Sequence, residues 1–264
     1  MPSQLSETPA RRHALSSADA APTSAIRRYA SASPTFDTKL AASLQALKDA
    51  DAQFQPLKQA SSLGVEDVVI SHMIERLALA IPVFVLETGA LHGETLQLLA
   101  RIQKRAAVPI QVYRPDAKAV DAFINSNGSQ AMYQSIELRK ACCGIRKMEP
   151  LARALAGQRA WVTGLRQEQS GSRAEVPLID RSEEAQGGRI KVNPLALWTW
   201  GDVWHYIALH SLDYNPLHDA FVPSIGCEPC TRAISDGEDF RAGRWWWESE
   251  SAKECGLHVK EATA

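Results

Sequence analysis

The stretch EDVVISHMIERLALAIPVFVLETGALHGETLQLLA, residues 66–100, decides the fold because it passes from helix to strand and back to helix. Its first part, 66–80, has apolar residues at helical spacing, while the short apolar run 81–88 is typical of a buried strand. A second helical pattern follows over 93–106. This alternation favours an α/β fold, in which a mainly parallel sheet carries helices on both faces.

The same alternation extends in both directions from this stretch. Leu40, Leu44 and Leu47 recur at helical spacing, so a helix is predicted over 36–50. Downstream, strands are predicted over 109–115, 159–165 and 189–195, and helices over 117–126 and 199–210.

Three segments do not follow the alternation. Residues 1–35 are rich in Ala, Ser and Pro, and we interpret them as a disordered tail, with an organellar targeting segment as the alternative. The polar stretch 168–189 is predicted to be a long mobile loop, and turn signals dominate from Tyr214 onward. We therefore expect an α/β domain over 36–240 that ends in an irregular lobe. A C-terminal segment over 241–264, with a mobile tail, should follow it.

Composition limits the classes of function. The chain has 264 residues, 45% of them hydrophobic, and a formal net charge of -1, which gives no general attraction to nucleic acid or to an anionic membrane. An anionic ligand must therefore be held by a local group of Lys and Arg. No apolar run approaches the roughly 20 residues of a membrane helix. With five cysteines and no secretory signal, we expect a reducing, cytoplasmic location.

Two loops have the composition of ligand-binding loops. Residues 61–67, SSLGVED, precede a helix, so Ser61, Ser62 and Gly64 would let the backbone approach an anion, although Ser and Asp are also ordinary helix caps. In LETGALHGET, Thr88 and Gly89 follow directly on a strand. They should lie at the carboxyl edge of the sheet, where α/β folds bind ligands, although a simple turn explains Gly89 equally well.

Basic side chains accompany these loops. Arg146 and Lys147 lie in CCGIRK, Arg166 and Arg173 lie around the polar loop, and Arg241 and Arg244 lie in DFRAGRWWW. Such residues are usually solvated surface charges, but a group of them can bind a phosphate or sulfate. The adjoining tryptophans, Trp245 to Trp247, are interpreted as lobe core or as a surface on which a base stacks.

The cysteines carry the most specific signal. Cys142 and Cys143 are adjacent, while Cys227 and Cys230 form a C-x-x-C pair. Four thiolates can bind zinc or an iron–sulfur cluster. Adjacent cysteines suit one small ion poorly, whereas a cluster offers them separate irons, so spacing favours a cluster. Zinc and two buried thiol pairs remain as alternatives.

Cys255 is left over in the polar stretch SAKECGLHVK, residues 251–260. A polar segment is a poor place for a core cysteine. The thiolate is the reactive form, and the neighbouring Lys253 and His258 would favour it. Spacing alone leaves a nucleophile and an incidental surface thiol both open.

Taken together, these segments closely resemble the assimilatory sulfonucleotide reductase family, in particular its bacterial iron–sulfur adenylyl-sulfate (APS) reductases. The resemblance covers the chain from about residue 55 to Val259. The motifs that carry it, in the order of the family, are SSLGVED, LETGALHGET, CCGIRK, TGLRQEQS, NPLALWTWGDVW, NPLHDAFVPSIGCEPCTR, GEDFRAGRWWWE and KECGLH.

The resemblance implies an adenine nucleotide α-hydrolase-like fold, related to that of the ATP pyrophosphatases. It also implies reduction of APS to sulfite and AMP through an S-sulfocysteine at Cys255, in sulfate assimilation and cysteine biosynthesis. A [4Fe–4S] cluster would be held by Cys142, Cys143, Cys227 and Cys230. The implied substrate-binding residues are Ser61, Ser62, Gly64, Glu66, Asp67, Thr88, Gly89, Lys147, Gly164, Arg166, Arg173, Arg241 and Arg244.

The resemblance also concerns partners. Thioredoxin or glutaredoxin would be the reductant, as a separate protein because the chain ends soon after Val259. A homo-oligomer, either a dimer or a tetramer, is implied, with no nucleic-acid or membrane partner. One departure from the expected fold concerns QPLKQASS, residues 55–62, whose pattern is poor for a buried strand.

Three rival functions remain at this stage. A 3′-phosphoadenylyl-sulfate (PAPS) reductase, or an enzyme that accepts both nucleotides, is the nearest, but those enzymes usually lack the paired cysteines. An ATP pyrophosphatase of tRNA thiolation would carry an S-G-G-x-D-S loop, which is absent. A non-catalytic iron–sulfur sensor would have no use for the cysteine in ECGLH.

Overall fold

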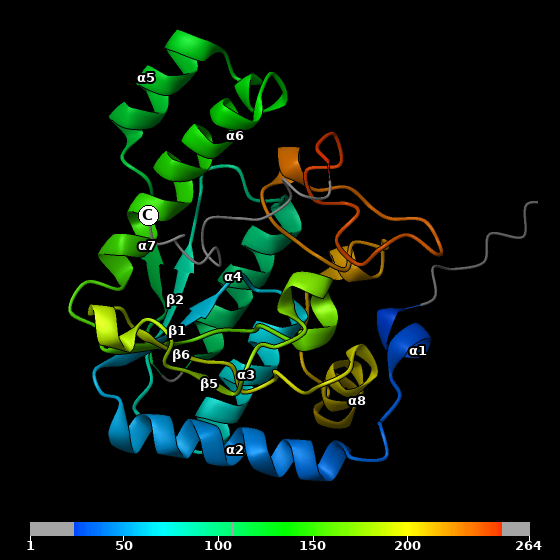
Figure 1. Cartoon of the computed structure of the whole chain (residues 1–264). Coiled ribbons are helices and arrows are strands. Elements are labelled where there is room, and N and C mark those ends of the chain that lie inside the picture. Colours follow the sequence, from blue (N-terminus) through cyan, green and yellow to red (C-terminus); the bar gives the residue numbers. More distant parts are fainter. Residues whose placement is uncertain (1–23, 107, 250–264) are drawn as a thin grey trace, which may run out of the picture.

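The computed structural model describes residues 24–106 and 108–249. Within them, six strands form one sheet in the order β3-β2-β1-β4-β6-β5, in which all neighbouring pairs are parallel except β5 with β6 (Figure 1). The strands are β1 (Leu57–Ser61), β2 (Val83–Leu86), β3 (Gln111–Tyr113), β4 (Ala160–Val162), β5 (Ile179–Asp180) and β6 (Ile190–Val192). The predicted α/β fold with a mainly parallel sheet is confirmed.

Helices connect the strands. The α-helices are α1 (Ala25–Tyr29), α2 (Phe36–Gln53), α3 (Val65–Arg76), α4 (Gly93–Arg105), α5 (Ala117–Asn127), α6 (Ile136–Cys143), α7 (Glu149–Ala154) and α8 (Trp200–His210). Gly144–Met148 forms a π-helical turn between α6 and α7. The sequence pattern predicted α2, α3, α4, α5 and α8, but not the other three.

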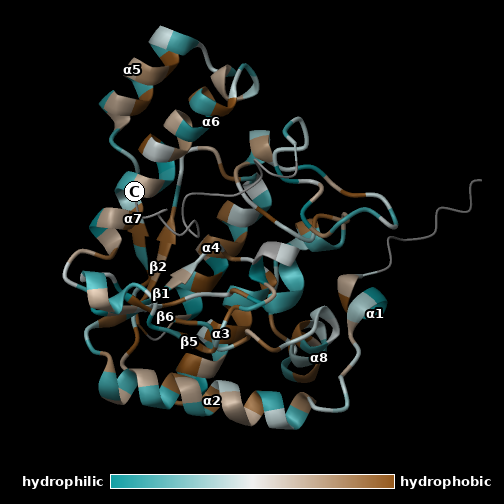
Figure 2. Cartoon of the chain, viewed as in Figure 1, coloured by the Kyte–Doolittle hydropathy of each residue, from teal (hydrophilic) through white to brown (hydrophobic). Residues whose placement is uncertain are grey.

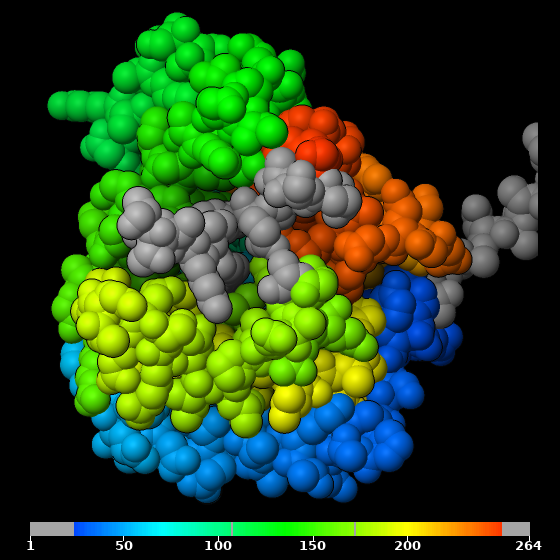
Figure 3. Space-filling view, in the orientation of Figure 1, coloured from blue at the N-terminus to red at the C-terminus, as the bar shows by residue number. Residues whose placement is uncertain are grey.

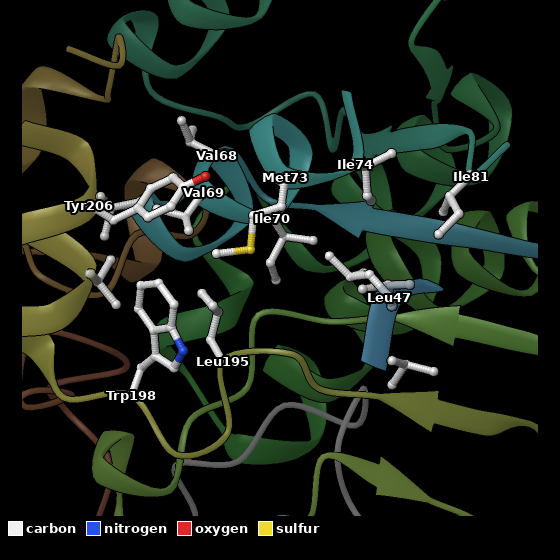
Figure 4. Close-up of a cluster of buried hydrophobic side chains, with 14 of the residues drawn as sticks. Leu47, Val68, Val69, Ile70, Met73, Ile74, Ile81, Leu195, Trp198 and Tyr206 are labelled. Atoms are coloured by element: carbon white, nitrogen blue, oxygen red, sulfur yellow. The ribbon is translucent and has the colours of Figure 1, made fainter. Parts of the chain in front are cut away.

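Both faces of the sheet are covered by helices. Successive strand residues point to opposite sides, so each strand contributes side chains to both faces. On one face, Leu57, Val162 and Val192 pack with α2, α3 and α8 in the largest hydrophobic cluster. On the other face, Phe84 and Trp161 pack against α7. Figure 2 shows β2 in the brown of hydrophobic residues, and helices on which polar and apolar residues alternate. Figure 4 shows side chains of the first cluster, with those of α3 converging on the segment that leads into α8.

Strand β1 was not predicted, because its sequence is polar, yet it lies inside the sheet between β2 and β4. Its buried Gln59 explains how a polar strand is tolerated there. The Gln59 side-chain amide donates to the Asp67 carbonyl at 2.9 Å, and its oxygen accepts from the Ser71 hydroxyl at 2.9 Å. Both partners lie on α3, so the buried amide has hydrogen bonds that make its burial acceptable.

The N-terminal segment differs from its prediction. A disordered tail was expected over residues 1–35, but the chain is folded from Ser24 onward, while residues 1–23 lie outside the described residues. The reason is a set of contacts distant in sequence. Ala25 donates its backbone N–H to Asp219, and the Ser33 backbone and the Lys39 ammonium both bind the fully buried carboxylate of Asp202 on α8.

Two irregular regions complete the described chain. The loop predicted over 168–189 contains short 3-10 turns, at Gln167–Gln169, Gly171–Arg173 and Glu184–Gln186, and strand β5. Beyond α8, the described residues up to 249 form the expected irregular lobe, which has only two 3-10 turns, Pro216–His218 and Glu228–Cys230.

The Asp202 network yields a test of how the N-terminal segment is held. Burial alone raises the pKa of this carboxyl, but hydrogen bonds from Lys39, Ser33 and Thr199 lower it to about 2. Asp202→Ala leaves those donors without their acceptor, so we expect a loss of about 3 kcal/mol in the free energy of unfolding. Urea unfolding measures it. The exposed Asp37→Ala variant is the control, and an equal loss in both variants would contradict this account.

Candidate active site

A cavity opens where the carboxyl ends of β1, β2 and β4 meet. Ser61 ends β1, Thr88 follows β2, and Gly164 follows β4, and all three line the cavity. Its walls are partly apolar, with Phe84 and Trp161 from the sheet. This is the edge of a parallel sheet at which α/β folds bind ligands, and aromatic walls suit a base.

One side of the cavity carries carboxylates from the first turn of α3. Asp67 accepts hydrogen bonds from the Ser62 backbone N–H at 2.6 Å and from the Ser62 hydroxyl at 2.7 Å. Burial raises the pKa of Asp67 to about 6, although these two bonds act in the opposite direction. The Asp67 Oδ1 atom lies so near Gly164 that a Cβ there would be 2.5 Å from it. Any larger residue at position 164 would therefore displace the carboxylate.

The charge of the neighbouring carboxylate, Glu66, is balanced by a buried guanidinium that does not line the cavity. The buried Arg166 guanidinium donates its Nε–H to Glu66 Oε1 at 3.0 Å, and its Nη1 contacts Glu168 at 2.9 Å. Gln169 donates to the same Glu66 oxygen at 3.0 Å. Arg173 in turn donates to the Gln169 side-chain oxygen at 2.6 Å. These bonds fix the start of α3 against the loop that follows β4.

Positive charge reaches the cavity from three other segments. Lys147 comes from the π-helical turn, Arg173 from the loop after β4, and Arg241 and Arg244 from the C-terminal lobe. Arg244 is held by the carbonyls of Cys230 and Ile225, at 3.3 and 3.2 Å. A local group of cations of this kind can hold an oxyanion on a chain whose net charge is close to zero.

The four cysteines of the two predicted pairs come together beside this cavity. Cys142 and Cys143 end α6, Cys227 precedes the turn Glu228–Cys230 and Cys230 ends it, and none of the four is in a disulfide. Burial raises the pKa of Cys142, and it raises that of Cys230 to about 12, with the Cys227 and Cys143 thiols adding to the second shift. Lys147 acts in the opposite direction on both thiols, so this cavity-lining cation also lies near them.

Hydrogen bonds connect the thiols to the loop after β2. The Thr88 hydroxyl lies 3.3 Å from the Cys227 sulfur, and the Glu228 N–H donates to the Ala90 carbonyl at 2.8 Å. Arg146 donates to the Thr88 carbonyl at 2.7 Å. The cavity edge and the C-x-x-C turn are therefore parts of one structure.

The surroundings of the thiols fit a sulfur-rich group. Cys142, Cys227 and Cys230 share an apolar cluster with the buried Trp245 and with Met132. The Trp245 indole N–H is buried and has no hydrogen-bond partner among the described residues. A buried donor of this kind calls for an acceptor, which a sulfide or thiolate would supply. Within residues 24–106 and 108–249, no three His, Cys, Asp or Glu side chains are placed to hold a single metal ion.

Comparison with known proteins identifies the family. The family model of the phosphoadenosine phosphosulfate reductase domain matches residues 56–233. The chain belongs to this family. It is 48% identical over 227 residues to the adenosine 5′-phosphosulfate reductase of Allochromatium vinosum. The aligned residues cover 86% of this chain and 88% of that protein.

Solved structures agree on the fold of the family. The phosphoadenylyl-sulfate (PAPS) reductase of Candida auris, in a phosphate complex, matches with a TM-score of 0.61 and 25% identity, over 76% of this chain and 98% of that chain. Yeast FAD synthetase in complex with FAD matches with a TM-score of 0.52 and 11% identity, over 79% and 73%. The second likeness concerns the fold alone, and it supports the adenine nucleotide α-hydrolase-like class.

Most of the expected binding residues of this family member meet in the cavity. Those that line it are Ser61, Ser62, Gly64, Glu66, Asp67, Thr88, Lys147, Gly164, Arg173, Arg241 and Arg244. Gly89 and Arg166 do not. Gly89 has a φ of +68° and turns the chain. Arg166 does not line the cavity and instead forms a buried ion pair with Glu66. Cys255 lies outside the described residues.

Two residues of the site were not expected from the sequence, Gln169 and Gly226. Gln169 joins Glu66 to Arg173. Gly226 lines the cavity, and a Cβ there would be 2.3 Å from the Arg244 guanidinium, so a larger residue would displace that side chain. Of the two, only Gly226 carries a local signal, as a glycine directly before the C-x-x-C pair. Arg146, one of the expected basic residues, holds the loop after β2. No helix in the described part of the chain has the length and apolar character needed to cross a bilayer.

The raised pKa of Asp67 makes stability depend on pH. The folded protein holds a proton up to about pH 6, whereas the unfolded carboxyl releases it near 3.8. Relative to Asp67→Asn, the free energy of unfolding should therefore fall as pH rises from about 4 to about 6, by up to about 3 kcal/mol in all. Urea unfolding across this range measures it. The exposed Asp121→Asn is the control, and parallel wild-type and Asp67→Asn profiles would contradict the assignment.

Proposed function

We propose that this chain reduces adenylyl sulfate (APS) to sulfite and AMP, with Cys255 as nucleophile and thioredoxin or glutaredoxin as the reductant. The observation that carries the proposal is a cavity at the carboxyl edge of the sheet, lined by four basic residues, beside four converging thiols. The name of the Allochromatium vinosum relative supports APS as the substrate.

The apolar wall and the charged walls of the cavity suggest how the nucleotide is oriented. The nucleoside would lie against Phe84 and Trp161, and the ribose hydroxyls would donate to the carboxylates of Glu66 and Asp67. The phosphosulfate would lie among Lys147, Arg241 and Arg244, with Arg173 nearby. Cations there would offset the repulsion between a thiolate and the anionic substrate, and would stabilise the charge that develops on the leaving phosphate.

The reaction balances in two steps. First, the Cys255 thiolate attacks the sulfur of the sulfate group, the bond from sulfur to the bridging oxygen breaks, and AMP leaves with that electron pair. The product on the enzyme is an S-sulfocysteine. Second, a thiolate of the reductant attacks the Cys255 sulfur, and sulfite leaves with the electrons of the sulfur–sulfur bond. The second thiol of the reductant then closes its own disulfide and returns Cys255 to a thiol.

We further propose that Cys142, Cys143, Cys227 and Cys230 hold a [4Fe–4S] cluster. The support is the donor set, four thiols beside a Trp245 N–H that has no partner in the described part of the chain, together with the spacing of the cysteines. When bound, such a group would supply structural support and a local electrostatic field beside Lys147. The reducing compartment that keeps these thiols unpaired would be the cytoplasm. A homo-oligomeric state stays a prediction.

The nearest rival is reduction of PAPS, which the name of the matching family domain and that of the Candida auris structure keep open. PAPS carries one more phosphate than APS. At neutral pH, above its pKa of about 6, the Asp67 carboxylate brings negative charge to the cavity, so an added phosphate on the ribose would be repelled. The proposal therefore favours APS.

Steady-state sulfite release tests the proposed reaction. With reduced thioredoxin, wild-type protein should release sulfite from APS, with kcat/KM at least about tenfold higher than with PAPS, because repulsion of the extra phosphate costs more than about 1.4 kcal/mol. Cys255→Ser should release none above background, since a hydroxyl cannot form the intermediate. Equal sulfite release by Cys255→Ser would refute the nucleophile, and a preference for PAPS would refute the substrate.

Metal content tests the cluster separately. Anaerobically purified wild-type protein should hold about four irons and four sulfides per chain, with broad visible absorption. Cys230→Ser should lose most of the iron and that absorption, because one ligand of the cluster is missing. Cys255→Ser is the matched control and should keep both. Stoichiometric zinc in place of iron, or iron unaffected by Cys230→Ser, would overturn this assignment.

A further inference from the structure

Three aromatic side chains gather on the surface next to the thiols, and we refer to them as the aromatic patch: Tyr133, Trp246 and Trp247. The Tyr133 ring lies 4.5 Å from Trp247 and 6.2 Å from Trp246, between ring centroids. Trp246 and Trp247 are 4.8 Å apart, in an edge-to-face arrangement. None of the three lines the cavity that we assign to the nucleotide.

The aromatic patch is fixed rigidly to the thiol-bearing turn. The Tyr133 hydroxyl donates to the Pro229 carbonyl, inside the C-x-x-C turn, at 2.6 Å. Trp247 packs against the cluster of Cys142, Cys227 and Cys230. The buried pair of Arg139 and Glu248, at 2.6 Å, then ties the end of the described chain to α6. Figure 3 shows the same junction, where the red end of the lobe meets the green region of α5 and α6.

Part of the patch remains open to solvent. Tyr133 is 40% exposed and Trp246 is 39% exposed. Large aromatic side chains that contact one another at a surface are typical of binding sites, because they bring contact area at low entropic cost. The two side chains together expose roughly 200 Å². That area suits the centre of a small, transient contact, and falls short of the roughly 800 Å² per partner of a stable dimer.

The position of Cys255 in the sequence indicates which transient partner this is. Trp246 lies nine residues before Cys255, and Ser249 lies six residues before it. Six residues of backbone span at most roughly 20 Å, so the Cys255 sulfur cannot be farther than that from the end of the described chain. A protein that attacks this sulfur therefore works within reach of Trp246.

We propose that the aromatic patch is the docking surface for the dithiol protein that releases sulfite from Cys255. This inference rests on the proposed function and adds to it a recognition surface outside the nucleotide cavity. A partner with an apolar surface beside its attacking thiol would pack on Trp246, which Trp247 and Tyr133 contact. The reductant must bind and dissociate in every turnover. A small apolar contact area permits that fast dissociation.

The test separates the two half-reactions with Trp246→Ala. In the first half-reaction, APS alone should form the S-sulfocysteine adduct at a rate within twofold of wild type, because Trp246 does not line the cavity. In the second, the KM for thioredoxin should rise about fivefold or more, which corresponds to about 1 kcal/mol. Sulfite release by dithiothreitol, which needs no docking, should stay within twofold. Trp246→Phe keeps an aromatic ring and should restore most of the thioredoxin affinity.

The control is Leu209→Ala, which removes another exposed apolar side chain, 59% exposed on α8. It should leave the KM for thioredoxin unchanged. An unchanged KM in Trp246→Ala, with normal adduct formation, would overturn the docking inference while the proposed function stands. A shift in sedimentation of Trp246→Ala with no change in KM would assign the patch to contacts between copies, and would also overturn it. Failure of wild type to form any adduct refutes the proposed function itself.

Discussion

The site depends on a close approach between the start of α3 and the end of β4. The Asp67 carboxylate fits against Gly164 with no room for a side chain, and its hydrogen bonds from Ser62 close the loop after β1. The pair of Glu66 and Arg166 makes the same junction from the buried side. Because both carboxylates are held there, the first turn of α3 presents acceptors, and oxyanions must be held elsewhere in the cavity.

The cations that would hold an oxyanion lie at the junction between the sheet and the C-terminal lobe. Arg244 binds the carbonyls of the C-x-x-C region, and Thr88 contacts the Cys227 sulfur, so the thiols and the cationic wall share one framework. A change at the thiols would therefore reach the groups that we assign to the phosphosulfate. The aromatic patch extends this framework to the surface through Trp247. Nucleotide, cofactor and reductant would then meet at adjoining parts of one lobe.

The sequence predicted what depends on local pattern and missed what depends on distant partners. The helices α2, α3, α4 and α8 follow from periodicity, and the loop after β2 was expected at the sheet edge, where its Thr88 lies. Strand β1 was missed because the hydrogen bonds that allow Gln59 to be buried come from α3. The folding of residues 24–35 depends on Asp202, and the structural task of Arg166 depends on a carboxylate a hundred positions away. No local signal reports such contacts.

In the proposed mechanism a thiolate of this chain, and no electron transfer from a metal group, breaks the bond between sulfur and oxygen in APS. Intact-mass analysis after a single turnover without reductant tests this step. We expect the protein to gain the mass of one SO₃ group, peptide mapping to locate it on Cys255, and AMP to appear in equal amount. Free sulfite released from APS in the absence of any thiol, with an unmodified Cys255, would contradict it.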